Sequence, residues 1–128
     1  MPDNMKSKVL IVDDDSKNIF ALTAVLKAKK LATVSAMSAA EGIGLLRSES
    51  GIAVVLLDMM MPDMDGYEAI REIRKDPLLR DLPVVAVTAQ AMTGDREKCL
   101  AAGADHYISK PIDVDALLGL LASFIKTG

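Results

Sequence analysis

The chain has 128 residues, which fits one domain, and its formal net charge of −3 gives no sign of the basic face that nucleic-acid binding requires. No apolar stretch approaches the ~20 residues needed to span a bilayer, and the start of the chain lacks the apolar centre of a secretory signal. With one cysteine, Cys99, the chain cannot form an internal disulfide, so we expect a soluble cytoplasmic protein that binds neither membrane nor nucleic acid.

Segments typical of strands and of helices alternate along the chain. Short runs of Val, Ile and Leu indicate strands buried on both faces, and apolar residues at helical spacing indicate the helices. Ser16 is the expected N-cap of the first helix, and Ser38 with Glu41 forms the expected capping box of the second. In chain order we predict strand 9–12, helix 16–29, strand 33–37, helix 39–49, strand 53–57, helix 66–75, strand 84–87, helix 92–102, strand 106–109 and helix 113–126.

Five successive strand–helix units with short links imply an α/β fold, in which helices cover both faces of a parallel sheet. No linker, repeat or low-complexity segment divides the chain, so we expect a single domain over residues 1–128. The last predicted helix has the cleanest apolar face, made of Val114, Leu117, Leu118, Leu121, Phe124 and Ile125.

Four of the five predicted strands end in a polar side chain that can carry chemistry. In a parallel sheet these ends meet at one edge, where open α/β folds bind their ligands. Taken alone, each residue has an ordinary explanation, such as an aspartate in a turn or a lysine on the surface. The repetition at four strand ends favours a common site. Its candidate members are Asp13, Asp14 and Asp15 after the first strand, Asp58 after the third, Thr88 after the fourth and Lys110 after the fifth.

Carboxylates gathered at one edge repel one another unless a cation neutralises them, and Mg²⁺ suits oxygen ligands of this kind. An aspartate oxygen can accept a phosphoryl group, which makes Asp58 a candidate acceptor. Lys110 would then supply a positive charge, and Thr88 a hydroxyl donor, to the phosphoryl oxygens. The segment Asp63–Gly66 lacks the ligand spacing and the closing glutamate of a calcium loop, so we interpret it as turn chemistry.

These residues also lie in motifs of a known family. The motifs are Val9–Asp15, Leu57–Gly66, Pro83–Ala89 and Tyr107–Pro111. Over about residues 8–126 the chain resembles the receiver domain of bacterial two-component response regulators. The resemblance implies a flavodoxin-like fold with five parallel strands in the order 2-1-3-4-5. It also implies a phosphoacceptor signalling domain rather than an enzyme.

The resemblance assigns roles at the acidic edge. Asp58 is the implied phosphoacceptor, and it shares the Mg²⁺ with Asp14, which binds the ion directly. Asp13 helps through water, and the backbone carbonyl of Met60 completes the protein ligands. Asp15 matches a variable position and is not expected to bind the metal.

The resemblance further implies a switch. Thr88 and Lys110 match the pair that binds the phosphoryl group, Tyr107 matches an aromatic residue that turns inward on activation, and the bond from Lys110 to Pro111 matches one that is usually cis. A phosphoryl group on Asp58 adds roughly one to two negative charges. Drawing Thr88 toward it would make room for the ring and reshape the surface of the last two helices and the strand between them. That surface is the expected contact with a downstream protein.

The implied function is phosphorelay signalling, with the phosphoryl group coming from a phosphohistidine on a histidine kinase or a phosphotransfer domain. Residues 88–105 are similar to receivers joined to hybrid sensor kinases. Met60 and Gln90 match positions that influence the lifetime of the phosphorylated state, and we predict that Met60 shields the aspartyl phosphate from water.

Three alternatives have specific requirements. An aspartyl-phosphate phosphohydrolase or phosphotransferase needs a carboxylate two residues after the nucleophile, where this chain has Met60. A flavin-binding carrier needs a hydroxyl-rich or Gly-rich loop after the first strand, where this chain has three aspartates. A degenerate receiver that only binds proteins would not need the complete set of Asp, Thr and Lys.

Overall fold

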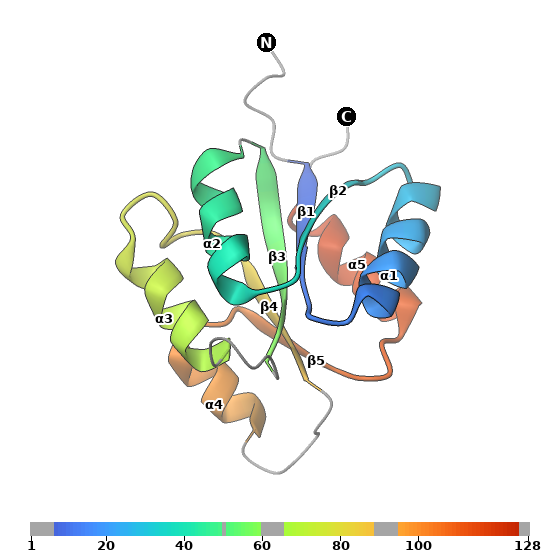
Figure 1. Ribbon diagram of the computed structural model, residues 1–128. Coiled ribbons are helices and arrows are strands. Elements are labelled where there is room, and N and C mark those ends of the chain that lie inside the picture. The colour runs from blue at the N-terminus through green and yellow to red at the C-terminus, as the bar shows by residue number, and fades with distance from the viewer. Residues whose placement is uncertain (1–6, 50, 60–65, 89–94, 126–128) are drawn as a thin grey trace.

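The computed structural model in Figure 1 describes residues 7–49, 51–59, 66–88 and 95–125. Within these residues, five strands form one parallel sheet in the order β2-β1-β3-β4-β5, which confirms the expected α/β fold and strand order. The strands are β1 (Lys8–Val12), β2 (Ala32–Ala36), β3 (Ile52–Asp58), β4 (Val84–Thr88) and β5 (His106–Ser109). The helices are α1 (Ser16–Ala28), α2 (Ala39–Ser48), α3 (Gly66–Lys75), α4 (Asp95–Ala102) and α5 (Val114–Ala122). None of the described helices is both long and apolar enough to cross a lipid bilayer.

The helices cover both faces of the sheet, α1 and α5 on one face and α2, α3 and α4 on the other (Figure 1). The central strand β3 is buried along its whole length. Its residues Val54 and Leu56 pack into the cluster with α1 and α5, and Val55 and Leu57 pack into the cluster with α2, α3 and α4. Because side chains alternate along a strand, Asp58 projects from the same face as Leu56.

The parallel register brings the carboxyl ends of the strands together. Val12, the last residue of β1, pairs with Leu57, which directly precedes Asp58. Asp58 in turn pairs with Val87, which directly precedes Thr88. The polar residues that follow or end these strands therefore meet at one edge, as the sequence predicted.

The caps at two helix starts differ in how well the sequence predicts them. The prediction that Ser16 caps α1 is wrong, because the preceding Asp15 has the extended backbone of a cap and its side chain accepts a hydrogen bond from the backbone N–H two residues later, at 2.9 Å. Ser38 caps α2 as predicted, with its hydroxyl accepting from the Glu41 N–H at 3.1 Å. The Glu41 carboxylate accepts in turn from the backbone N–H of Met37.

The end of α5 also differs from the prediction. The helix ends at Ala122 rather than near residue 126, and the Ser123 hydroxyl donates to the carbonyl three residues back, at 2.6 Å. Ile125 still reaches the core, but Val114, predicted on the apolar face, is 37% exposed. Among the other elements, β2 begins one residue earlier than predicted, and residues 92–94 of the fourth predicted helix lie outside the described part of the chain.

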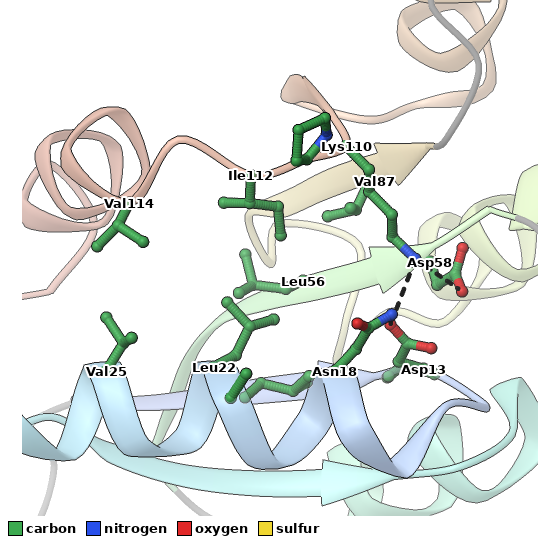
Figure 2. Close-up of a pocket in the computed structure, with 14 residues that line it drawn as sticks. Asp13, Asn18, Leu22, Val25, Leu56, Asp58, Val87, Lys110, Ile112 and Val114 are labelled. Atoms are coloured by element: carbon green, nitrogen blue, oxygen red, sulfur yellow. Dashed lines mark hydrogen bonds and ion pairs between the residues drawn. The ribbon is translucent and has the colours of Figure 1, made fainter.

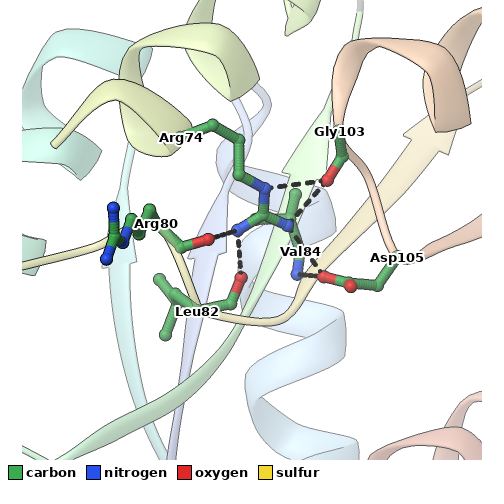
Figure 3. A network of polar contacts seen from close by, with 6 residues as sticks. All are labelled: Arg74, Arg80, Leu82, Val84, Gly103 and Asp105. Carbon is green, nitrogen blue, oxygen red and sulfur yellow. Dashed lines mark hydrogen bonds and ion pairs between the residues drawn. The ribbon is translucent and has the colours of Figure 1, made fainter. Parts of the chain in front are cut away.

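At the opposite edge, the amino ends of β4 and β5, one arginine joins three segments (Figure 3). Arg74 lies in the last turn of α3, and its guanidinium contacts the loop before β4 and the loop before β5. Its acceptors are the carbonyls of Gly103 (2.9 and 2.6 Å), Arg80 (2.9 Å) and Leu82 (2.7 Å) and the carboxylate of Asp105 (2.9 Å). Asp105 also accepts from the Val84 N–H at 2.8 Å, so the charges at this edge are compensated within the fold.

Candidate functional site

Three carboxylates gather at the carboxyl edge of the sheet. One oxygen from each of Asp13, Asp14 and Asp58 lies within 4.8 Å of the others. Asp13 and Asp58 are 4% and 5% exposed, and Asp14 is exposed. Buried carboxylates at this separation repel one another strongly, and hard divalent cations prefer oxygen ligands. The group can therefore hold a cation such as Mg²⁺.

Both carboxylate oxygens of Asp13 accept hydrogen bonds. Oδ1 accepts from the Asp15 backbone N–H at 2.9 Å, and Oδ2 accepts from the side-chain amide of Asn18 at 3.3 Å. Asn18 was not predicted from the sequence as a site residue. The only available signal was its position in the first turn of α1, five residues after Asp13, and a polar residue in a first turn is common.

Lys110 supplies the positive charge among the described residues of the site. Its Nζ lies 3.6 Å from Oδ2 of Asp13 and 3.6 Å from Oδ2 of Asp58, and Figure 2 shows it above Asp13 and beside Asp58. Its backbone N–H donates to the carbonyl of Thr88 at 2.7 Å, which ties the end of β5 to the end of β4. The peptide bond from Lys110 to Pro111 is cis, as the resemblance implied.

Thr88 and Tyr107 lie on the face of the sheet that α2, α3 and α4 cover. Tyr107 pairs with Ala86, is half-buried and packs against the cluster that contains Ala86. Thr88 is 3% exposed and comes two residues after Ala86, so it projects from the same face. Both residues therefore lie on the face of the sheet that α4 covers. Thr88 is the last residue of β4, and Tyr107 lies within the neighbouring strand β5.

The residue after Asp58 is held by the start of α3. A Cβ placed on Gly66 would lie 2.6 Å from the sulfur and 2.7 Å from the Cα of Met59, so the two backbones approach closely there. Met59 is itself 6% exposed and belongs to the core. The positions predicted for Met60, Asp63, Asp65 and Gln90 lie outside the described residues.

Comparisons with known proteins agree with this arrangement. A family model described as the response regulator receiver domain matches residues 9–122. The polar-differentiation response regulator DivK of Brucella ovis is 34% identical over 121 residues, which cover 94% of this chain and 98% of DivK.

Two solved structures are informative for the site. The receiver domain of the sensor histidine kinase PA1611 from Pseudomonas aeruginosa PAO1, with a magnesium ion coordinated in the active site cleft, is 32% identical with a TM-score of 0.80, covering 94% of this chain and 98% of that one. The second is the co-crystal structure of the Saccharomyces cerevisiae histidine phosphotransfer signalling protein Ypd1 with the receiver domain of its downstream response regulator Ssk1. It matches at 27% identity with a TM-score of 0.82, covering 94% of this chain and 89% of that one.

Proposed function

The chain belongs to the response regulator receiver domain family and acts in phosphorelay signalling, and from this premise we propose that Asp58 is the side chain that accepts the phosphoryl group. The observation that carries the proposal is the placement of Asp58. It is 5% exposed at the carboxyl edge, with the Lys110 Nζ at 3.6 Å and two further carboxylates close enough to share a cation. In the transfer, the P–N bond of a phosphohistidine breaks as an oxygen of Asp58 forms the new P–O bond.

We propose one receiver domain over residues 1–128, which assists this transfer rather than turning over a substrate of its own.

The donor set fits Mg²⁺, because three carboxylate oxygens lie within 4.8 Å of one another. When bound, the ion neutralises the carboxylates and balances the charge of the transferring group. Asp14 is exposed and suits direct contact with the ion. Asp13 suits contact through water, because both of its oxygens already accept hydrogen bonds. The carbonyl of Met60 remains the fourth proposed protein ligand.

Lys110 and Thr88 would hold the phosphoryl group once it is on Asp58. The Lys110 ammonium already lies 3.6 Å from the Asp58 carboxylate, so a small movement lets it pair with the added oxygens. The Thr88 hydroxyl would donate to another of them, and the Tyr107 ring would follow into the space that Thr88 leaves. The placement of Thr88 and Tyr107 on the face that α4 covers supports a change in the surface of α4, β5 and α5, where we place the downstream partner.

The proposed donor is a histidine kinase or a histidine phosphotransfer domain. Two similar structures support this class: one is a receiver domain of a sensor histidine kinase, and the other pairs a receiver domain with the phosphotransfer protein Ypd1. The carboxylates of the site lie at the sheet edge beside α1, so a donor histidine has to approach along that edge.

Phosphorylation by acetyl phosphate, read by intact mass, tests the proposal. We expect one added phosphoryl group in the presence of Mg²⁺, none after chelation, and none in Asp58→Asn with Mg²⁺ present. Asp81→Asn is the matched control, since Asp81 is an exposed carboxylate in the loop before β4 and should leave uptake unchanged. Uptake that persisted in Asp58→Asn, or without a divalent cation, would contradict the proposal.

A further inference from the structure

A cavity of about 480 Å³ opens beside the carboxylates, between α1 and the segment 110–114 (Figure 2). Its volume lies in the range of small-molecule sites in proteins, roughly 300–1,000 Å³. Most of its lining is aliphatic, and among the described residues no aromatic side chain lines it. The phosphoryl transfer proposed for Asp58 uses only the residues at its mouth and assigns no role to the larger, apolar part.

Some of the side chains that line the cavity are short. On α1 the lining includes Ala21 and Val25, and across the gap it includes Val114, which is left 37% exposed. The one aromatic residue of α1, Phe20, is 77% exposed and is not among the lining residues. Apolar surface left open in this way favours an apolar ligand, because a ligand bound there removes that surface from water.

The polar groups of the cavity are confined to one end. Figure 2 shows Asp13, Asn18, Asp58 and Lys110 together at the mouth, with Val25 and Val114 at the far end. The two lining carboxylates and the nearby Asp14 outnumber the single ammonium, so the mouth carries net negative charge. A ligand that fits both ends has an apolar body and a cationic head.

We propose that this cavity is a binding site for small amphipathic amines, whose hydrocarbon body lies among Leu22, Val25 and Leu56 and whose ammonium group meets the carboxylates of Asp13 and Asp58. The ammonium group and a divalent cation then compete for the same oxygens. By linkage, each weakens the binding of the other by the same factor. On the proposed function, such an amine inhibits phosphorylation of Asp58, and this last consequence rests on that function.

Binding is tested on metal-free protein by NMR titration of the Leu and Val methyl groups, a readout that does not depend on phosphoryl transfer. The probe is n-hexylammonium, and the expected shifts lie at Leu22, Val25 and Leu56. Going from n-butylammonium to n-hexylammonium adds two methylene groups and should tighten binding about tenfold. Saturating Mg²⁺ should weaken it.

Two compounds of the same length test the chemistry of the ligand. Hexanoate exchanges the cationic head for an anionic one, and 1,6-diaminohexane places a second charge at the apolar end. Both should bind at least about tenfold more weakly than n-hexylammonium, since a charge without a partner is costly to bury. Equal binding of either compound would overturn the proposal, as would binding that is insensitive to Mg²⁺.

Matched substitutions on α1 test the location. Ala21→Phe fills the cavity and should abolish the methyl shifts, whereas Ala24→Phe, on the same helix but outside the lining, should leave the affinity unchanged. Val114→Phe blocks the cavity from the opposite wall if Ala21→Phe does not fold. Unchanged affinity in a folded blocking variant would overturn the proposal. Phosphorylation of the same variants without any amine reports separately on the proposed function, since none of these three residues belongs to the metal or phosphoryl site.

Discussion

At the amino ends of β4 and β5, one guanidinium donates to three carbonyl groups and to Asp105, whereas at the carboxyl ends of β1 and β3 one ammonium pairs with two of three clustered carboxylates. The two edges belong to the same parallel sheet (Figure 1). At the amino edge every partner of the arginine comes from the fold itself. At the carboxyl edge the charges sum to a negative excess that suits an external cation.

The difference indicates how the domain separates stability from function. A charge that is fully hydrogen-bonded within the fold stabilises it and holds its neighbours in one arrangement. Carboxylates that repel one another cost stability, and that cost is relieved when a cation binds. We therefore expect substitutions that remove a charge to destabilise the metal-free protein at the amino edge and to stabilise it at the carboxyl edge.

The largest expected effect is at the amino edge. Arg74→Ala leaves the carbonyls of Gly103 and Leu82 without this donor and removes the ion pair with Asp105, and should lower the free energy of unfolding by about 3 kcal/mol. Urea denaturation measures this. Arg71→Ala, an exposed residue of the same helix, is the control and should change stability by less than about 0.5 kcal/mol. Similar losses in both variants would show that the edge is not held by this network.

Packing at the carboxyl edge gives the next effect in size. Gly66→Ala places a methyl group against the Met59 backbone and should cost about 2 kcal/mol, because a backbone atom cannot move aside as a flexible side chain can. Gly119→Ala in α5 meets nothing within 4 Å and should instead stabilise by roughly 0.5–1 kcal/mol. Thermal unfolding compares the two, and a neutral Gly66→Ala would mean that the start of α3 does not hold Met59 in place.

Charge at the carboxyl edge should act in the opposite direction. Asp14→Asn removes one of the mutually repelling carboxylates and should stabilise the metal-free protein by about 1 kcal/mol, a value reduced by the exposure of this group. The same variant should lose most of the stabilisation that Mg²⁺ confers on the parent chain. Asp15→Asn is the control, because Asp15 lies outside the cluster of Asp13, Asp14 and Asp58 and asparagine is also a good helix cap. It should change neither the stability of the metal-free protein nor the stabilisation by Mg²⁺. Destabilisation of metal-free Asp14→Asn would contradict the comparison.

The smallest effect concerns Asp76, after α3 at the amino edge. The backbone N–H of Leu78 and the Arg47 guanidinium hydrogen-bond to its carboxylate and hold the pKa of Asp76 below its ordinary value of 3.8. A lowered pKa in the folded state contributes stability that is present above pH 3.8 and is lost as the pH falls through the folded value. The stability difference between the parent and Asp76→Asn should therefore be constant near neutral pH and shrink below about pH 4. A difference that does not change with pH would rule out this contribution.

The sequence alone was sufficient to predict where the polar strand ends lie, for a physical reason. Each of Asp58, Thr88 and Lys110 directly follows or ends a short predicted strand, and a parallel sheet collects all such ends at one edge. The cap of α1 and the end of α5 were harder, because the adjacent residues Asp15 and Ser16 are both good helix caps and the apolar spacing of α5 continues beyond Ala122, where the helix ends.

Other features depend on distances that no local pattern encodes. The acceptors of Arg74 lie 6, 8, 29 and 31 residues further along the chain, mostly as backbone carbonyls, which carry no sequence signal. Asn18 meets Asp13 only because α1 folds back over the end of β1. Val114 lines the cavity and is 37% exposed, although helical spacing placed that residue on the buried face of α5.

The most direct test of the central claim is to locate the modified residue itself. Reduction of the phosphorylated protein with borohydride converts an aspartyl phosphate to homoserine, and peptide mass mapping finds the altered position. The account predicts homoserine at position 58 alone, formed only when Mg²⁺ was present during phosphorylation. Homoserine at position 13 or 14, or at position 58 without a divalent cation, would contradict it.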